Sequence, residues 1–101
     1  MIVSKMRDYR LTKQAFKTLK LLAKNDLKTA KRLKDIIEKL RLDSVEGESL
    51  QGYSQFKKIR VGKFRLIYSY QEELLLIAII EKRETVYQTF AHLLKNSSFL
   101  E

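Results

Sequence analysis

The sequence lacks cysteine, proline and tryptophan altogether, and it contains a single histidine among its 101 residues. A chain without cysteine has no disulfide framework, no zinc–thiolate site and no cysteine nucleophile. One histidine is too few for a histidine-rich metal site or for an acid–base pair of histidines. From the residues alone we therefore expect neither a metal nor another cofactor.

Long hydrophobic runs are missing as well. The first eight residues contain no apolar stretch of signal-peptide length, and no run approaches the roughly 20 residues that cross a bilayer. Single domains are most often about 100–150 residues long, so we expect one domain over residues 1–101 with a core between packed layers. We expect this domain to be soluble and cytoplasmic, with no membrane partner.

Positive charge, by contrast, is in excess and unevenly placed. The chain has 21 Lys and Arg against 12 Asp and Glu, a net charge of +9. Residues 1–42 hold 13 Lys and Arg against 4 Asp and Glu, whereas residues 43–101 hold 8 of each. Most of these lysines keep amphipathic helices solvated, but the total charge attracts polyanions such as a phosphate backbone at long range.

The first half of the chain predicts a short strand and two helices. Asp8–Leu11 alternates as a strand, Thr12 follows as the N-cap of a helix that ends near Asn25, and Asp26 caps the next helix. The apolar stripes of the two helices are Phe16, Leu19, Leu22 and Ala23, and Ala30, Leu33, Ile37 and Leu40. These stripes predict an antiparallel helix pair that rests on a sheet.

The second half predicts strands after a loop at Asp43–Gly52. The expected strands and closing helix are Gln55–Val61, Lys63–Tyr70, Leu74–Lys82 and Thr85–Lys95. The third strand is apolar on both of its faces, as a strand covered on both sides is. We therefore expect an α+β fold: an antiparallel twisted sheet of about four strands, with the N-terminal helix pair packed on one face and a C-terminal helix.

Strand alternation gathers positive side chains on one face of this sheet. In Phe56–Val61 the apolar residues Ile59 and Val61 belong in the core. Because side chains alternate along a strand, Lys58 and Arg60 project together from the opposite face. Arg65 falls on the same face of the next strand, and Arg83 follows the buried strand where the chain returns to solvent. Like charges repel, so the cluster costs stability unless an anion neutralises it. The alternative is an exposed face that charge merely keeps solvated.

Two runs of the sequence, at residues 60–68 and 82–87, resemble motifs of the RelE/ParE superfamily. Its members are the toxins of bacterial and archaeal type II toxin–antitoxin systems. The resemblance extends from about Tyr9 to Tyr87, and its most specific pieces are the runs Arg-Val-Gly-Lys-Phe-Arg-Leu-Ile-Tyr at 60–68 and Lys-Arg-x-x-Val-Tyr at 82–87. It implies a RelE-like fold. It also implies a cognate antitoxin that wraps the domain with an acidic or amphipathic segment, over the basic helices and any exposed sheet edge.

The RelE branch of the superfamily cleaves mRNA in the ribosomal A site, where the RNA 2′-hydroxyl attacks the adjacent phosphate. The resemblance thus implies the ribosome and mRNA as partners. The site residues that it implies are Lys58, Arg60, Arg65, Arg83 and Tyr87. Guanidinium groups stabilise charge on a phosphorane, and we expect the arginines around Lys58 to make it a base near neutral pH. Tyr87 would stack on a base or assist the leaving oxygen.

Six further residues keep two interpretations each. His92 is either the catalytic histidine that some relatives place near the C-terminus or a partly buried packing residue. Glu81 is either a base or a local partner of a cation. Tyr68 and Tyr70 suit the core and its rim better than base stacking, and Phe99–Leu100 either packs back on the sheet or contacts a partner.

Three functions compete at this point. The first is a ribosome-dependent endoribonuclease toxin, favoured by the joint presence of the basic residues and the tyrosine. The second is a non-catalytic toxin similar to the ParE branch, which poisons DNA gyrase by protein–protein contact. The third is a basic nucleic-acid-binding module, which only the net positive charge favours.

Overall fold

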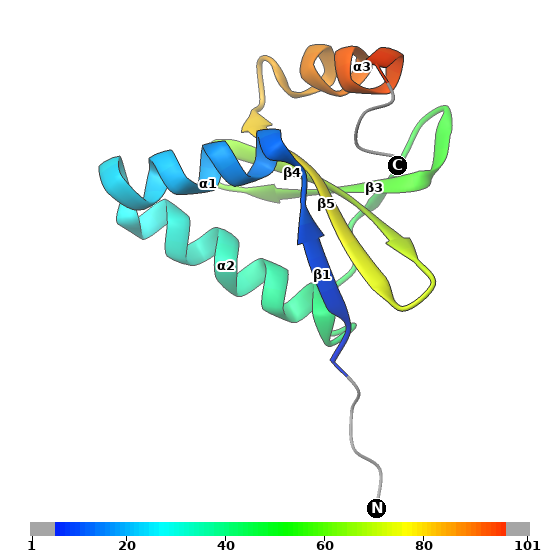
Figure 1. Cartoon of the computed structure of the whole chain (residues 1–101), viewed down its shortest axis with the longest axis horizontal. Helices are drawn as coiled ribbons and strands as arrows, with labels where there is room; N and C mark the ends of the chain where they lie inside the picture. The colour runs from blue at the N-terminus through cyan, green and yellow to red at the C-terminus, as the bar shows by residue number, and fades with distance from the viewer. Residues whose placement is uncertain (1–5, 97–101) are drawn as a thin grey trace, which may run out of the picture.

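A five-stranded sheet with helices on both faces makes up residues 6–96, the part of the chain that a computed structural model describes (Figure 1). The elements are β1 (Asp8–Leu11), α1 (Lys13–Asn25), α2 (Leu27–Arg41), β2 (Glu48–Leu50), β3 (Tyr53–Val61), β4 (Phe64–Gln71), β5 (Leu74–Lys82) and α3 (Val86–Asn96). This architecture confirms the predicted α+β class. Phe99–Leu100 lies outside the described residues.

The strand order in the sheet is β1-β5-β4-β3-β2. β1 runs parallel to β5, and the other neighbours pair antiparallel. β5 is buried from Leu75 to Ile80, which confirms a strand covered on both faces. β2 is a fifth strand, inside the segment predicted as a loop, where Glu48 pairs with Lys58 of β3. A three-residue strand has too little pattern of its own to be predicted.

The helix caps are those that the sequence predicts. The hydroxyl oxygen of Thr12 accepts a hydrogen bond from the Ala15 amide at 3.1 Å, and the Asp26 carboxylate accepts one from the Thr29 amide at 3.2 Å. The hydrogen bonds from Thr29 lower the pKa of Asp26 below its ordinary value. Each cap satisfies an amide that has no partner inside the helix.

The buried side of α1 differs from the predicted stripe. Ala15 and Leu19 face the core, whereas Phe16 is 53% exposed and Ala23 is also exposed. The reason is that β1 pairs with β5 only as far as Ile77. Beyond that point side chains of α1 and its cap bind the free backbone groups of β5. Thr12 donates to the Ala78 carbonyl at 2.6 Å, and the Gln14 amide group bonds both the N–H and the C=O of Ile80 at 2.9 and 2.8 Å. These bonds set the rotation of the helix.

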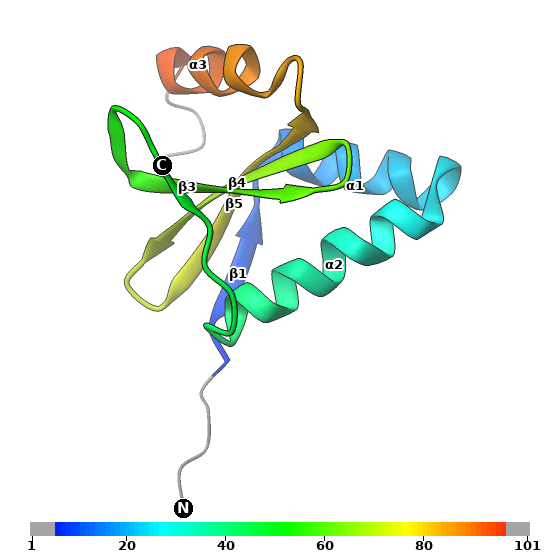
Figure 2. The same ribbon diagram turned by 180° about the vertical axis from the view of Figure 1, so that it is seen from behind.

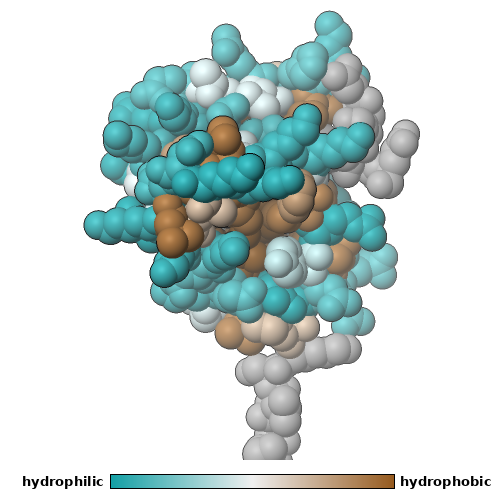
Figure 3. All heavy atoms as spheres, turned by 60° about the vertical axis from the view of Figure 1, so that its left-hand side comes forward, coloured by the Kyte–Doolittle hydropathy of each residue, from teal (hydrophilic) through white to brown (hydrophobic). Residues whose placement is uncertain are grey.

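The sheet lies between the helix pair α1–α2 and α3 (Figure 2), and an apolar cluster fills the space on each side of it. The larger one lies under α1 and α2, where the stripe predicted for α2 is buried in full, from Ala30 to Leu40. Hydrophilic residues, with some hydrophobic ones between them, make up most of the surface on this side of the molecule (Figure 3). On the opposite face of the sheet, α3 packs Val86 and Phe90 against Ile67. Within residues 6–96, no helix has the length and apolar character needed to span a bilayer.

Candidate functional site

A pocket of about 600 Å³ opens on the α3 side of the sheet, over the strands that α3 leaves uncovered. It contains all five residues that the resemblance implies for the site. Its lining residues are Glu46, Gly47, Glu48, Lys58, Ile59, Arg60, Arg65, Arg83 and Tyr87. The structure thus gathers residues from β2, β3, β4, the end of β5 and α3 in one hollow.

The strands position the cations as the alternation predicts. Lys58 and Arg60 lie two residues apart on β3, and Arg65 of β4 is the direct register partner of Arg60. The turn between these strands is tight because Gly62 has a φ of +61°, a conformation that glycine adopts without strain. Arg83 follows β5 directly, and its amide donates to the Lys63 carbonyl at 3.1 Å, which holds it beside this turn.

Tyr87 reaches the pocket from the first turn of α3. Burial of its neighbour Val86 against the sheet leaves Tyr87 on the outer side of the helix, with 48% of its surface exposed. Its hydroxyl oxygen accepts a hydrogen bond from Lys58 Nζ at 2.9 Å, and the same ammonium lies 5.4 Å from the centre of the Tyr87 ring. Lys58 and Tyr87 therefore form a contact between strand and helix at the edge of the pocket.

This contact contradicts the expectation that Lys58 is a base near neutral pH. The hydrogen bond to Tyr87 raises the pKa of Lys58 above its ordinary value, with a smaller contribution from the nearby Glu48 carboxylate. These effects outweigh both burial and the repulsion from Arg65, which act to lower that pKa. Lys58 is consequently a cation at neutral pH and adds to the positive charge of the pocket.

Glu81 and His92, the two residues for which the sequence left a catalytic role open, lie outside the pocket lining. Glu81 is the register partner of Arg65, but its carboxylate accepts hydrogen bonds from the Thr89 hydroxyl at 3.1 Å and the Lys82 amide at 3.3 Å. His92 lies on α3 beyond Tyr87 and is exposed, so its interpretation as a partly buried packing residue is wrong. Neither residue contributes to the pocket as the structure describes it.

The tyrosines of β4 are core and rim residues, as predicted. Tyr68 is fully buried, and its hydroxyl oxygen accepts a hydrogen bond from the Gly47 amide at 2.8 Å. Tyr70 donates to the Leu40 carbonyl at 2.8 Å, and burial raises its pKa to about 12. Both rings lie on the helix-pair side of the sheet, away from the pocket.

No ion pair within residues 6–96 holds the cations of the pocket. Across residues 6–96 the ion pairs are Arg7–Asp43, Lys39–Asp35, Arg41–Glu38 and Lys57–Glu46. None of these pairs includes Lys58 or the three arginines of the pocket. Lys57, which alternates to the other side of β3, takes the Glu46 carboxylate, and the pocket cations remain available to an anionic ligand.

Sequence reasoning missed the acidic wall of the pocket. Glu48 lies opposite Lys58 because β2 pairs with β3 there. This pairing depends on Gly47, where a Cβ atom would overlap the carbonyl oxygen of Lys58 and crowd the Tyr68 ring. The only signal in the sequence is a glycine between two glutamates, within a segment that otherwise predicts a loop.

An aromatic pocket of about 460 Å³ adjoins the first and shares Lys58 and Tyr87 with it. Tyr53, which is 44% exposed, lines it from the start of β3 and meets the ring of Phe90 edge-on at 5.2 Å. Exposed aromatic rings beside cations are the groups on which unpaired bases of single-stranded nucleic acid stack. The two pockets together have the chemistry to hold a phosphate and a flat ring next to it.

Comparisons with known proteins agree with the resemblance. The family model of the ParE toxin of type II toxin–antitoxin systems matches residues 9–87. No curated protein sequence matches the chain. Among solved structures, a Staphylococcus aureus YoeB dimer is 21% identical with a TM-score of 0.69, covering 78% of this chain and 99% of its own. An Escherichia coli YafQ mutant is 23% identical with a TM-score of 0.64, at 78% and 96% coverage.

Similar proteins have also been solved with partners. One structure is a YoeB–YefM toxin–antitoxin complex from Staphylococcus aureus, and another is the DinJ–YafQ toxin–antitoxin complex from Escherichia coli. At these levels of identity the structures establish the fold, and the family model, which covers most of the chain, establishes the family. The chain therefore belongs to the ParE toxin family within the RelE/ParE superfamily, and it is a toxin of a type II toxin–antitoxin system.

Proposed function

We propose that this toxin is a ribosome-dependent endoribonuclease that inhibits translation by cleaving mRNA in the pocket around Lys58. The observation that carries the proposal is the convergence of Lys58, Arg60, Arg65 and Arg83 in one hollow without a protein carboxylate paired to any of them among the described residues. Such a site favours a ligand with concentrated negative charge, and the phosphate of RNA supplies it.

The three arginines would stabilise the transition state of cleavage. When the 2′-hydroxyl oxygen attacks the adjacent phosphorus, the phosphorane gains negative charge on its non-bridging oxygens. Guanidinium groups bind such oxygens in pairs and remain charged at any physiological pH. Because they are positioned before the reaction, they stabilise the developing charge with little reorganisation. Lys58, held as a cation by Tyr87, adds to this stabilisation.

Glu48 and Tyr87 suit the two proton transfers. Glu48 is the carboxylate of the pocket that has no ion pair within residues 6–96, so it would accept the proton of the attacking 2′-hydroxyl. Tyr87 would give its hydroxyl proton to the leaving 5′-oxygen, because the Lys58 ammonium stabilises the negative charge left on the phenol oxygen. The P–O5′ bond breaks, and the products are a 2′,3′-cyclic phosphate and a 5′-hydroxyl end.

The second candidate is a toxin that poisons DNA gyrase by protein–protein contact. It is favoured by the family model, which describes the ParE toxin of parDE systems. In that function the basic pocket has no reacting group to hold, and its uncompensated charge would serve only solubility or contact with the partner. In either case a cognate antitoxin with an acidic or amphipathic segment fits the charge of the toxin.

A translation assay with primer extension separates the two candidates. Purified toxin is added to a translation extract, and mRNA ends are mapped in parallel with double-strand breaks in a gyrase-supercoiled plasmid. We expect mRNA breaks at defined codon positions that disappear when ribosomes are omitted, and an intact plasmid. Intact mRNA together with gyrase-dependent plasmid breaks would overturn the nuclease proposal in favour of the second candidate.

A further inference from the structure

A second positively charged pocket lies at the end of the β3–β4 hairpin. Its volume is about 660 Å³, and it shares Arg60, Arg65 and Arg83 with the candidate site. Lys63 and Lys82 line it as well. The three arginines thus form a common wall with one pocket on each side, and we call the second one the hairpin pocket.

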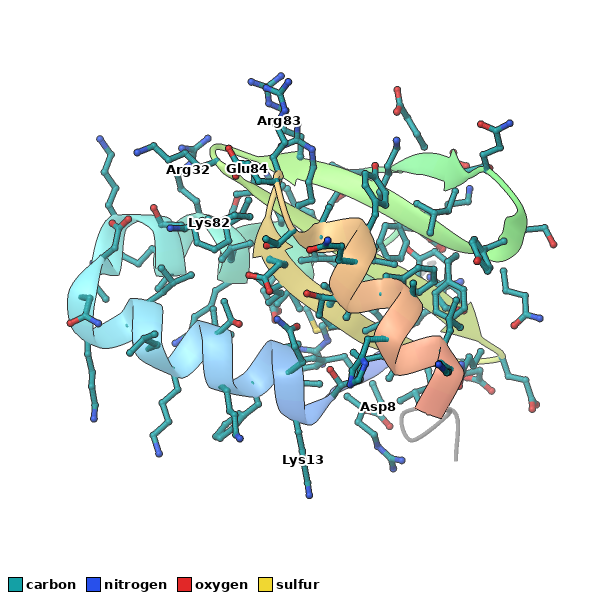
Figure 4. The ribbon with its side chains drawn as sticks, turned by 90° about the horizontal axis from the view of Figure 1, so that it is seen from above. Asp8, Lys13, Arg32, Lys82, Arg83 and Glu84 are labelled. Carbon is teal, nitrogen blue, oxygen red and sulfur yellow. The ribbon has the colours of Figure 1, made fainter. Side chains whose placement is uncertain are left out.

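The hairpin pocket is open to solvent and rich in free positive charge. Lys63 and Lys82 are both exposed, and in residues 6–96 neither takes part in an ion pair. Figure 4 shows Lys82, Arg83 and Glu84 near one another, with Arg32 of α2 on the same side of the molecule. The carboxylate of Glu84 lines the pocket, and Lys63 contributes to the lowered pKa of Asp26. These two carboxylates offset only part of the local positive charge.

A single RNA strand carries one phosphate per nucleotide, and the two adjoining pockets offer a basic site to each of two neighbouring phosphates. An arginine has five N–H donors, so the shared wall has enough donors to serve a phosphate on each side. Aromatic rings stand only beside the first pocket, at Tyr53 and Tyr87, and the residues lining the hairpin pocket include none. The hairpin pocket therefore offers contacts to the backbone and not to a base.

We propose that the hairpin pocket is a second phosphate subsite, in which Lys63 and Lys82 bind the phosphate next to the scissile one. The inference rests on the proposed function, because it takes the first pocket as the site of the scissile phosphate. It also orients the bound strand. A base would stack at the α3 end, and a phosphate would be held at the hairpin end without recognition of its base. Contacts of this kind add affinity without sequence preference.

Binding of short RNA analogues that are not cleaved tests this subsite. A 2′-O-methyl dinucleotide has one internal phosphate and no attacking hydroxyl, and it is compared with versions that carry an extra phosphate on the 5′ or on the 3′ end. We expect one of the two extra phosphates to tighten binding about tenfold. In the double variant Lys63→Ala, Lys82→Ala this gain should fall below about twofold, while the dinucleotide without the extra phosphate binds as before.

The matched control removes the same charge elsewhere. The double variant Lys17→Ala, Lys24→Ala changes two exposed lysines of α1, and it should keep the full gain. The slope of log Kd against log salt for the end-phosphorylated dinucleotide should become less steep by about 0.7, the value for one phosphate contact on a single strand, only in the hairpin variant. Circular dichroism and thermal melting verify that both variants are folded.

Three results would overturn the inference: no gain from either extra phosphate, an equal loss of gain in the control variant, or a hairpin variant that loses only antitoxin affinity. The last result would mean that the hairpin pocket contacts the antitoxin and not a phosphate. The test is independent of catalysis, since the analogues cannot react. A toxin that shows the predicted binding but cleaves no RNA would disprove the proposed function and leave the phosphate subsite in place.

Discussion

The two faces of the sheet are built from the same strands but differ in how completely helices cover them. On the helix-pair face α1 and α2 close over a continuous apolar cluster, and the polar groups there, such as the Tyr70 hydroxyl, are bonded internally. On the opposite face α3 covers only the cluster around Phe90, and the uncovered part holds the charged pocket. The apolar cluster under the helix pair and the charged pocket thus lie on opposite sides of one sheet.

The comparison teaches that strand alternation and incomplete coverage together make the site. Along β3, Ile59 and Val61 stabilise the core from one side, while Lys58 and Arg60 are left facing solvent on the other. A longer or differently placed C-terminal helix would bury these cations at a large desolvation cost. Substitutions on the open face should therefore change activity, and substitutions on the closed face should change stability.

The largest effect is expected from Arg83→Ala on the open face. The guanidinium of Arg83 lines both charged pockets, and loss of one preorganised group that stabilises the transition state lowers a rate about 100- to 1000-fold. Growth arrest should disappear while thermal stability stays unchanged, since Arg83 is exposed. Arg10→Ala, at an exposed position on β1, is the matched control. Arrest that persists in the Arg83 variant at equal expression would remove this arginine from the mechanism.

Gly47→Ala should affect both faces of the sheet, because Gly47 lies against Lys58 of the pocket and Tyr68 of the core. The new Cβ would overlap the Lys58 carbonyl and crowd the Tyr68 ring, and overpacking of this kind costs about 1–3 kcal/mol. The shift would also move Glu48 away from its place opposite Lys58. We expect a lower midpoint of urea unfolding together with a lower cleavage rate. Ser49→Ala on the exposed part of β2 is the control, and equal midpoints for both variants would show that the close approach at Gly47 is unimportant.

Tyr87→Phe and Tyr70→Phe form a matched pair, because they remove one tyrosine hydroxyl from each face of the sheet. Tyr87→Phe on the open face removes the hydrogen bond that raises the pKa of Lys58, so this pKa should fall toward its ordinary value. A group with a raised pKa stabilises the fold below its unfolded pKa of 10.5 and loses that contribution as pH rises above it. At pH 7 the parent therefore has this contribution and the variant lacks it, but a hydrogen bond exposed to solvent contributes little, so the variant should be only slightly less stable and should differ mainly in cleavage rate. NMR titration of the Lys58 side chain measures the shift, and an unchanged pKa would contradict the assignment.

These expectations depend on how much the sequence could reveal of each face. The alternation in β3 and β4 predicts which side Lys58, Arg60 and Arg65 share, because side-chain direction in a strand is a local property. The caps at Thr12 and Asp26 are predictable for the same reason, since the capping residue lies next to the helix that it caps.

What the sequence could not reveal depends on contacts between distant segments. The rotation of α1 follows from bonds of Thr12 and Gln14 to β5, more than 60 residues away. The raised pKa of Lys58 depends on a helix 29 residues later in the chain. Glu48 enters the site only because Gly47 permits β2 to lie against β3. Local pattern supplies the charges of the pocket, whereas tertiary contacts raise the pKa of Lys58 and place Glu48 beside it.

Tyr70→Phe, the closed-face partner of the tyrosine pair, should cost about 1 kcal/mol of stability through loss of the hydrogen bond to the Leu40 carbonyl. Because burial raises the Tyr70 pKa from 10.0 to about 12, the folded state holds this proton more tightly than the unfolded state. The parent should therefore lose stability between about pH 10 and 12 more steeply than the variant does. Urea unfolding across this range measures the difference, with cleavage at pH 7 unaffected. A variant that loses activity in proportion to Tyr87→Phe would show that the two faces are coupled.

The smallest effect is expected from Lys20→Ala, on the outer side of the closed face. Lys20 is exposed on α1, and its ammonium lies 5.9 Å from the centre of the Phe16 ring, a contact that contributes little at an exposed position. Alanine is also a better helix former than lysine, which offsets part of the loss. Stability and the cleavage rate at saturating substrate should match the parent, and only the affinity for a polyanion should weaken, by an amount that vanishes at high salt. A loss that persists at high salt would mean that α1 makes a specific contact, and the division between a closed structural face and an open chemical face would then be too simple.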